Sequence, residues 1–349
     1  MIDIFPLSFI LAIFFIYLDR LFSKLGISNL RNTPQTLHEK SVSRFGGAAI
    51  FLCLFLITQF SSEPSYSFLK LFLLSSFPIF LVGLVDDLNV IIKPHFRLIV
   101  LMISAALCYF LLGTEAYNLE IPILDYFFQF KVFSVVFISF AIAGAVSACN
   151  AIDGINGLVK TWFLSALICL LFVSNLSFSL DIYLFFTALF FAVIPIFLFN
   201  FPFGKIFLGD GGAYFLGLAI SIGLIKVYQS NNLSPWFVLL MLSYPVTDML
   251  VSIIRRMVNR YSALNVDGQH LHHLVLKKVE KLQLGSEKRH HALTTFILFF
   301  LYFPFMMIAT NFPQDAQILQ LAFLFNLTLY LLVYFLLFPR KFLGLWRPF

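Results

Sequence analysis

Two adjacent carboxylates end an otherwise apolar stretch of the sequence. Asp86 and Asp87 close the run LVGLVDD and are followed by further apolar residues. Neighbouring carboxylates repel each other, and a divalent cation would remove most of that repulsion. Mg²⁺ is commonly held by one or two carboxylates together with substrate phosphates. The pair therefore indicates a site for a cation and a phosphate. The alternative is that the two acids only mark the end of a helix at the membrane interface.

A second polar group lies in the segment SACNAIDGINGLVK, residues 147–160. Asn150, Asp153 and Asn156 recur every three residues, so they share one face if the segment is helical. Gly154 and Gly157 would allow a backbone or a ligand to approach closely. A glycine-rich turn between helices would explain the glycines but not an aspartate framed by two asparagines, so the pattern favours a functional polar face.

A third acid, Asp210, lies in FLGDGGAYFLG at the start of another apolar run. If a helix begins there, its free backbone N–H groups and positive dipole end face the same region as the carboxylate. Carboxylates beside helix N-termini suggest that a cation and an anion share one site. A metal-bound diphosphate would meet that description.

A histidine cluster, His270, His272 and His273, lies in NVDGQHLHHLVLKKVEKL, residues 265–282. Histidines near neutral pH can bind a phosphate or a sugar, or carry a proton; a zinc site is the weaker alternative, because no cysteine is near. An apolar stripe with lysines around it predicts an interfacial amphipathic helix. The stripe consists of Leu271, Val275, Val279 and Leu282.

Three further polar residues each have two interpretations. Lys40 and Arg44 could reach a diphosphate, or could only set the orientation of the chain in a membrane. Asp248, in YPVTDML, lies inside an apolar run. An ionisable residue in such a run is a functional candidate, but a buried hydrogen bond between helices explains it equally well.

The elements that must position these residues are apolar helices. The chain has 349 residues, of which 60% are hydrophobic and only 11% charged, against about 25% charged in soluble domains. A membrane-spanning helix needs about 20 mostly apolar residues. The sequence predicts one all-α integral membrane domain, 1–349, with ten or eleven spans, near 1–18, 45–61, 67–85, 96–112, 132–149, 159–179, 182–200, 212–228, 235–254, 292–311 and 317–338.

The basic residues predict the orientation of these spans. With the N-terminus outside, the inner loops are 19–44, 86–97, 150–160, 200–211 and 255–291, followed by the tail from 339. All basic residues except Lys70, Lys131 and Lys226 then lie on the inner side, as the positive-inside rule requires. The net charge of +6 is explained in this way without a nucleic-acid partner. All seven histidines, Asp86, Asp87, Asp153 and Asp210 also fall on this cytoplasmic face.

Four motifs, GLVDDL, NAIDGINGL, FLGDGGAYFLG and DGQHLHH, occur in this order and on this face. Together they resemble the polyprenyl-phosphate N-acetylhexosamine-1-phosphate transferases over roughly residues 30–280. The resemblance implies that a polyprenyl phosphate attacks a UDP-amino sugar, giving polyprenyl-diphosphate-sugar and UMP. It implies Mg²⁺ as cofactor, with Mn²⁺ as a substitute, and an active site on the cytoplasmic face of the inner membrane of a multi-pass protein.

The resemblance also assigns roles to the motif residues. It implies catalytic roles for Asp86, Asp87 and Asp153, and metal binding by Asp210 and Asp87. Substrate binding falls to Asn150, Asn156, Lys40, Arg44, His270, His272 and His273. Many bacterial members carry a second aspartate where this chain has Asn156, which puts in doubt a charged role at that position rather than the activity.

The substrates expected from the resemblance are undecaprenyl phosphate and a UDP-HexNAc such as UDP-GlcNAc. The reaction would be the first step in the synthesis of O-antigen or another envelope glycan. Because members of the family can form homodimers, a homodimer is a further expectation. Two alternatives stay open at this point. One is transfer of phospho-MurNAc-pentapeptide by the same chemistry. The other is an ion-coupled secondary transporter, although transporter sites tend to lie near the membrane midplane and most of the inner acids here lie at one face.

Overall fold

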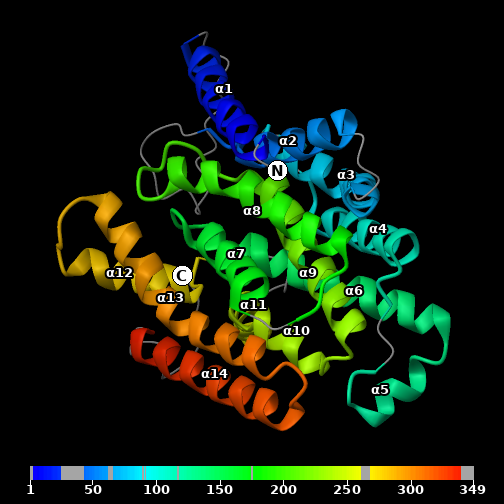
Figure 1. Ribbon diagram of the computed structural model, residues 1–349. Coiled ribbons are helices and arrows are strands. Elements are labelled where there is room, and N and C mark those ends of the chain that lie inside the picture. The colour runs from blue at the N-terminus through cyan, green and yellow to red at the C-terminus, as the bar shows by residue number, and fades with distance from the viewer. Residues whose placement is uncertain are drawn as a thin grey trace.

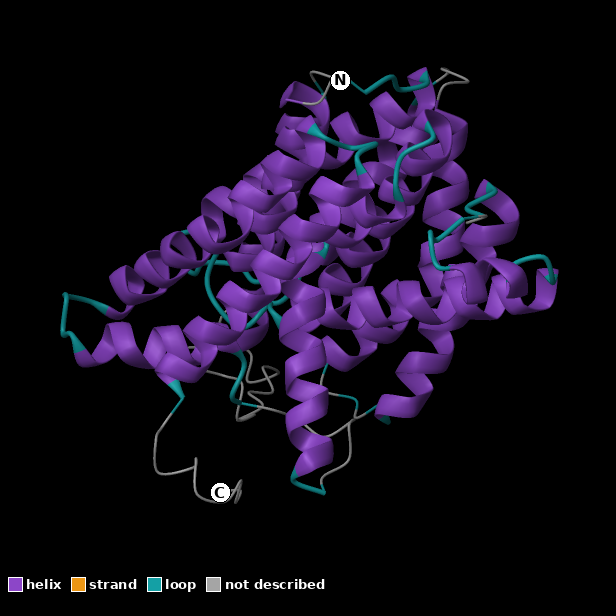
Figure 2. Ribbon diagram, turned by 90° about the horizontal axis from the view of Figure 1, so that it is seen from below, coloured by secondary structure: helices purple, strands orange, loops and turns teal. Residues whose placement is uncertain are grey.

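The computed structural model describes residues 3–24, 43–61, 66–88, 90, 92–115, 118–173, 176–260 and 268–338. Within these ranges the chain forms helices and loops, without a strand of its own (Figure 2). The helices are α1 Ile4–Lys24, α2 Gly46–Phe60, α3 Ser67–Asp87, α4 Pro94–Leu112, α5 Pro122–Phe127, α6 Lys131–Ala151, α7 Leu158–Ile168 with the π-helical turn Cys169–Val173, α8 Leu180–Asn200, α9 Gly209–Asn231, α10 Pro235–Met241, α11 Ser243–Val258, α12 Leu271–Lys281, α13 Glu287–Asn311 and α14 Ala316–Leu337.

The all-α membrane architecture is confirmed, but the count of eleven spans is not. Each of the eleven apolar runs contains a helix. Eight helices in the described ranges are long and apolar enough to cross a membrane, or nine if one bent pair forms a single span. The runs 45–61 and 159–179 form shorter apolar helices, α2 and α7 with its π-helical extension.

The predicted span 235–254 is wrong as a straight helix. It is broken into α10 and α11, which meet at an angle of 76°. Pro245 lies four residues after Met241, the last residue of α10. A proline lacks the N–H group for the helical hydrogen bond, and its ring clashes with the carbonyl four residues earlier. The break at Leu242 therefore follows from the sequence, and it directs α11 away from the line of α10.

Helix α9 forms the centre of the bundle, with α3 and α6 packed beside it (Figure 1). It is almost wholly buried, and small residues at its N-terminal end let neighbouring backbones come close. At Gly83 of α3, a Cβ atom would collide with the backbone of Gly211 in α9. This close packing places the C-terminal end of α3, with Asp86 and Asp87, against the N-terminal end of α9, with Asp210.

The C-terminal helices α12, α13 and α14 pack along another side of the bundle (Figure 1). The predicted amphipathic helix is present as α12: Leu271, Val275 and Val279 are buried, while Lys277 and Lys281 are exposed. Leu282, the fourth residue of the predicted stripe, follows the helix and is exposed, and the interfacial position stays a prediction. Because α12 contacts both α13 and α14, the histidines at its start are anchored to the bundle.

Candidate active site

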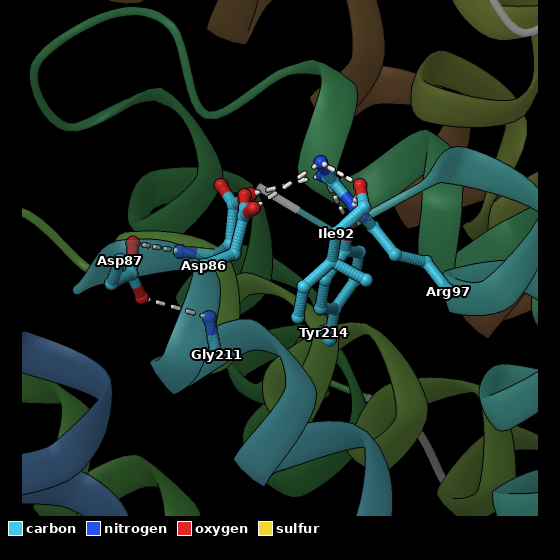
Figure 3. Close-up of polar contacts among 7 residues, drawn as sticks. Asp86, Asp87, Ile92, Arg97, Gly211 and Tyr214 are labelled. Carbon is cyan, nitrogen blue, oxygen red and sulfur yellow. Dashed lines mark hydrogen bonds and ion pairs between the residues drawn. The ribbon is translucent and has the colours of Figure 1, made fainter. Parts of the chain in front are cut away.

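Asp87 is held by the beginning of α9. Its Oδ1 accepts a hydrogen bond from the backbone N–H of Asp210 at 2.9 Å, and Oδ2 accepts one from Gly211 at 3.1 Å (Figure 3). These N–H groups are among those that the first turn of a helix leaves unpaired, where a negative charge is favoured. Gly209 has φ +76°, and a Cβ atom there would lie 2.5 Å from Asp87 Oδ2. Glycine is therefore required for this approach.

Asp86 and Asp210 share one cation, the guanidinium of Arg97. Arg97 Nη2 lies 3.3 Å from Asp86 Oδ1, and Nη1 lies 3.4 Å from Asp210 Oδ2. Tyr214 and the carbonyl of Ile92 also bind this guanidinium (Figure 3). The guanidinium thus brings the two carboxylates to one place. Sequence reasoning missed Arg97, which it treated only as one positive charge of the inner loops.

Asp153 forms a second charged group with Lys160. Lys160 Nζ lies 3.2 Å from Asp153 Oδ1, and its side chain is fully buried. Burial raises the pKa of Asp153 above its usual value of 3.8, while Lys160 and Arg44 hold it down. Arg44 also interacts electrostatically with Asp87, so it connects the two charged groups. The sequence predicted Lys160 only as a basic residue of an inner loop. Its pairing with Asp153 depends on the turn of residues 152–157, which the sequence did not predict.

The segment between α6 and α7 is a turn, so the expected shared face of three polar residues is wrong. Residues 152–157 leave the helical path, and Gly157 has φ +85°. Asn150 lies half-buried in the last turn of α6, and its carbonyl accepts a hydrogen bond from the Asp153 N–H at 3.1 Å. Asn156 is buried, and its backbone bonds to His291 and Thr295 of α13. The side-chain amide of Asn156 lies beside Gly204, where a Cβ atom would lie 3.0 Å from Nδ2; substrate binding by Asn150 and Asn156 stays a prediction.

The histidine cluster borders the turn that carries Asp153. The rings of His272 and His273 lie 4.1 Å apart between centroids. A Cβ atom on Gly154 would lie 3.0 Å from His272 Nε2 and 3.2 Å from His273 Nε2. His272 is fully buried, and neither ring nitrogen has a hydrogen-bond partner among the described residues. Burial and the neighbouring His273 lower the pKa of His272 well below 6.5, so this ring is neutral at physiological pH.

His270 points to another partner, Asp248. Its Nδ1 lies 2.7 Å from Asp248 Oδ2, and both side chains are buried. Of the two interpretations for Asp248, a buried hydrogen bond between helices is the one that the structure confirms.

Two further segments complete the surroundings of the site. Residues 43–47 pair with 206–208 through hydrogen bonds that include Gly46 N–H to Phe207 O at 2.9 Å, which places Arg44 beside the start of α9. Asn200, which the sequence did not single out, accepts a hydrogen bond from Gly157 N–H and donates one to Ile206 O, each at 2.7 Å. It ties the turn of Asp153 to the segment before Asp210. Lys40 lies outside the described residues.

The donor set fits a magnesium ion that is shared with a substrate. Within the described ranges, no three His, Cys, Asp or Glu side chains gather to hold a metal alone. Asp86 and Asp210 do approach each other, however, and two carboxylates suffice when phosphate oxygens complete the coordination. Both oxygens of Asp87 already accept backbone hydrogen bonds, so the geometry favours Asp86 over Asp87 as the partner of Asp210; metal binding by Asp87 stays a prediction.

Comparison with known proteins gives one family. Residues 69–228 match the model for glycosyl transferase family 4. The chain is 26% identical over 244 residues to the undecaprenyl-phosphate alpha-N-acetylglucosaminyl 1-phosphate transferase of Thermotoga maritima, covering 70% of this chain and 71% of that protein. It is 25% identical over 272 residues to a probable undecaprenyl-phosphate N-acetylglucosaminyl 1-phosphate transferase of Bacillus subtilis, covering 76% and 73%.

A shorter match has higher identity. The alpha-N-acetylglucosaminyl enzyme of Escherichia coli K12 is 30% identical over 151 residues, 40% of this chain and 39% of that protein. The matched residues 69–228 include Asp86, Asp87, Arg97, Asp153 and Asp210, which are the residues that the fold gathers at the N-terminus of α9 and in the adjoining turn. Over residues 69–228 the chain is therefore similar to glycosyl transferase family 4, and its relatives are glycosyl-1-phosphate transferases, which supports a membrane enzyme of that type.

Proposed function

We propose that the protein transfers N-acetylhexosamine 1-phosphate from a UDP-amino sugar to undecaprenyl phosphate, releasing UMP. The donor that we favour is UDP-GlcNAc, because the relatives named above are N-acetylglucosaminyl 1-phosphate transferases. In this reaction an oxygen of the lipid phosphate forms a bond to the β-phosphorus of the donor. The bond from that phosphorus to the bridging oxygen breaks, and UMP leaves with the oxygen.

The observation that carries the proposal is the pair of carboxylates, Asp86 and Asp210, beside Arg97 at the N-terminus of α9. Phosphoryl transfer depends on positioning and on neutralising phosphate charge more than on covalent catalysis. Asp86 and Asp210 would hold Mg²⁺, which when bound neutralises charge on the diphosphate oxygens. Arg97 provides a further positive charge beside them, and Asp87 keeps the first turn of α9 in place.

A second set of positive and polar groups would bind the rest of the donor. Arg44 interacts electrostatically with both Asp87 and Asp153, so we assign it contact with a phosphate group. His272 brings to the turn of Asp153 a ring whose nitrogens have no hydrogen-bond partner among the described residues and whose Nδ1 lies 4.0 Å from Asp248 Oδ2. Because the pKa of His272 is lowered, we assign it a hydrogen-bonding role toward the phosphate or the sugar, and not a cationic one.

An apolar cavity supports binding of the lipid. It measures about 520 Å³ and lies between α5, α6, α9 and the broken pair α10 and α11. Its lining is almost entirely hydrocarbon, with Phe137, Ala148, Trp236 and Ile253 among its residues. Ala148 precedes Asn150 by two residues, so a polyprenyl tail in this cavity would have its phosphate near the charged groups. The bend at Leu242 lets α11 pack against α6, so α11 closes one side of this space.

We place this site on the cytoplasmic face of the inner membrane, where the soluble nucleotide sugar and the lipid can meet, and the reaction at the first step of an O-antigen or related envelope glycan. The distribution of basic residues supports that orientation.

The proposal is tested by purified protein in detergent with undecaprenyl phosphate, Mg²⁺ and separate UDP-HexNAc donors, with UMP release as the measurement. We expect UMP with UDP-GlcNAc, dependent on both the lipid and the metal. Asp210→Asn, with little change in side-chain volume, is the matched inactive control. Absence of UMP with every donor, from protein that melts cooperatively, would overturn the proposal.

A further inference from the structure

Asp248 is the centre of a buried network that joins three helices. Its carboxylate accepts hydrogen bonds from His270 Nδ1 at 2.7 Å, from Leu271 N–H at 2.9 Å and from Tyr330 OH at 2.6 Å. These groups belong to the start of α12 and to α14, while Asp248 itself is in α11. The side chain of Asp248 is completely buried, so solvent cannot replace any of these bonds.

The two carboxylate oxygens have separate partners. Oδ1 accepts from Leu271 N–H and from Tyr330 OH, whereas Oδ2 accepts from His270. The bond to Leu271 fixes the first turn of α12, since that N–H has no partner within its own helix. The bond to His270 fixes the orientation of the imidazole and places its proton on Nδ1, the nitrogen that faces the carboxylate. One residue thus sets both the helix start and the imidazole.

The position of His270 affects the other two histidines. Its ring is nearly parallel to that of His272, with 5.5 Å between centroids, and lies 5.9 Å from that of His273. His272 and His273 are the rings that border Gly154 in the turn of Asp153. A rotated His270 would displace the ring stacked on it, because buried side chains in a close-packed interior leave no room for independent movement.

We infer that Asp248 is a positioning residue for the reaction: through its bond to His270 it holds the histidine cluster in the arrangement that faces the Asp153 turn. The inference rests on the proposed function. Among the described residues, no hydrogen bond or ion pair joins Asp248 to Asp86, Arg97 or Asp210 at the start of α9. Asp248 therefore acts through the histidines. The same network is reinforced by Arg255, which donates to Gln269 O at 2.8 Å and contacts Tyr334 of α14.

The separation of the oxygens allows a selective test. Asp248→Asn can keep an oxygen for Leu271 and Tyr330. It changes the group that bonds to His270 and also lies 4.0 Å from His272 Nδ1 from an acceptor to an N–H donor. We expect a protein with nearly unchanged melting temperature, kcat lowered roughly tenfold or more, and KM for both substrates within about threefold of wild type. A merely structural role would lower stability and kcat together.

Tyr330→Phe is the matched control, because it removes a bond to Oδ1 and leaves the bond to His270. We expect its kcat to stay within about twofold of wild type. If Tyr330→Phe lowers kcat as much as Asp248→Asn does, or if Asp248→Asn has wild-type kcat, the inference is wrong. Either result leaves the proposed function intact, which fails only if the wild-type protein releases no UMP.

His270→Asn replaces this test if Asp248→Asn does not fold. Its side-chain N–H can still donate to Asp248, but no ring remains to be positioned. The inference predicts a folded protein with a similar loss of kcat, and a further Asp248→Asn change in that background should add little. Wild-type kcat in His270→Asn would contradict it.

Discussion

Lys160 and Asp153 form an ion pair that is almost completely shielded from solvent. Nζ lies 3.2 Å from Oδ1, and the two side chains are 0% and 9% exposed. Removing one partner of a buried pair leaves a charge without compensation, which costs far more than the loss of a surface ion pair. The pair therefore fixes the turn between α6 and α7 as well as the charge of Asp153.

Lys160→Met should destabilise the protein by about 3–5 kcal/mol where Asp153 is ionised. Burial already raises the pKa of Asp153, and loss of Lys160 raises it further. The carboxyl group of Asp153 then binds a proton more tightly in the folded state than in the unfolded chain. The stability gained from this protonation is lost as pH rises through the pKa of Asp153 in the folded state. The melting temperature of Lys160→Met should fall further below that of wild type as pH is raised, whereas the double variant Asp153→Asn/Lys160→Met should show no such slope. An equal difference at every pH would contradict the assignment.

His272 should make the protein sensitive to acid. Burial keeps its ring neutral in the folded state, while the unfolded chain takes up a proton near pH 6.5. Because the unfolded state binds more protons, stability is present above about pH 6.5 and is lost as pH falls below it. His272→Gln should flatten the decline in melting temperature between about pH 6.5 and about pH 5. The exposed His95→Gln is the control and should leave the decline as in wild type.

Arg97→Met should separate the binding of metal from the rate of transfer. Without the guanidinium, Asp86 and Asp210 have no protein cation between them, so Mg²⁺ should be bound at lower concentration. The positive charge beside the transferred phosphate is lost as well, and kcat should fall by roughly 10²-fold or more. Lys93→Met, at the exposed start of the same helix, should change neither quantity. A higher Mg²⁺ requirement in Arg97→Met would contradict the assignment of the two carboxylates.

Gly144→Phe should impair binding of the lipid substrate and leave binding of the UDP-sugar unchanged. Gly144 lines the apolar cavity, and a Cβ atom there meets nothing within 4 Å, so the ring can enter the space assigned to the polyprenyl tail. We expect KM for undecaprenyl phosphate to rise about tenfold with KM for the UDP-sugar unchanged. Val136→Phe on the same helix, where the side chain is exposed outside the cavity, is the control. Equal effects of both changes would show that the cavity does not hold the tail.

The sequence predicted the residues of the site better than their partners. Asp86, Asp87 and Asp210 could be identified because glycines and apolar runs around them indicate a helix end and a helix start. Arg97 and Lys160 could not be assigned, since a basic residue beside a membrane span has a topogenic explanation by default. Their partners lie 113 and 7 residues away, and both pairings depend on how α3, α4, α7 and α9 pack.

The errors in the fold have similar physical causes. The period of three in Asn150, Asp153 and Asn156 suggested one helical face, but α6 ends at Ala151 and residues 152–157 form a turn in which Gly157 has φ +85°. Pro245 indicated a helix break within the predicted span 235–254. The prediction of one straight span followed the hydrophobicity of the run and did not use this proline. Neither hydropathy nor motif spacing indicates the network of Asp248, because its partners Tyr330 and His270 come from other segments of the chain.

The most direct test of the proposed reaction follows the β-phosphate of the donor. UDP-GlcNAc labelled with ³²P at the β-position is incubated with the purified protein, undecaprenyl phosphate and Mg²⁺, and the lipid and water phases are separated. Transfer of the sugar 1-phosphate predicts that the label enters the lipid phase in equal amount to unlabelled UMP in the water phase, and that Asp210→Asn abolishes both. Label that stays in the water phase as UDP while sugar enters the lipid would contradict the account, because the sugar would then be transferred without its phosphate.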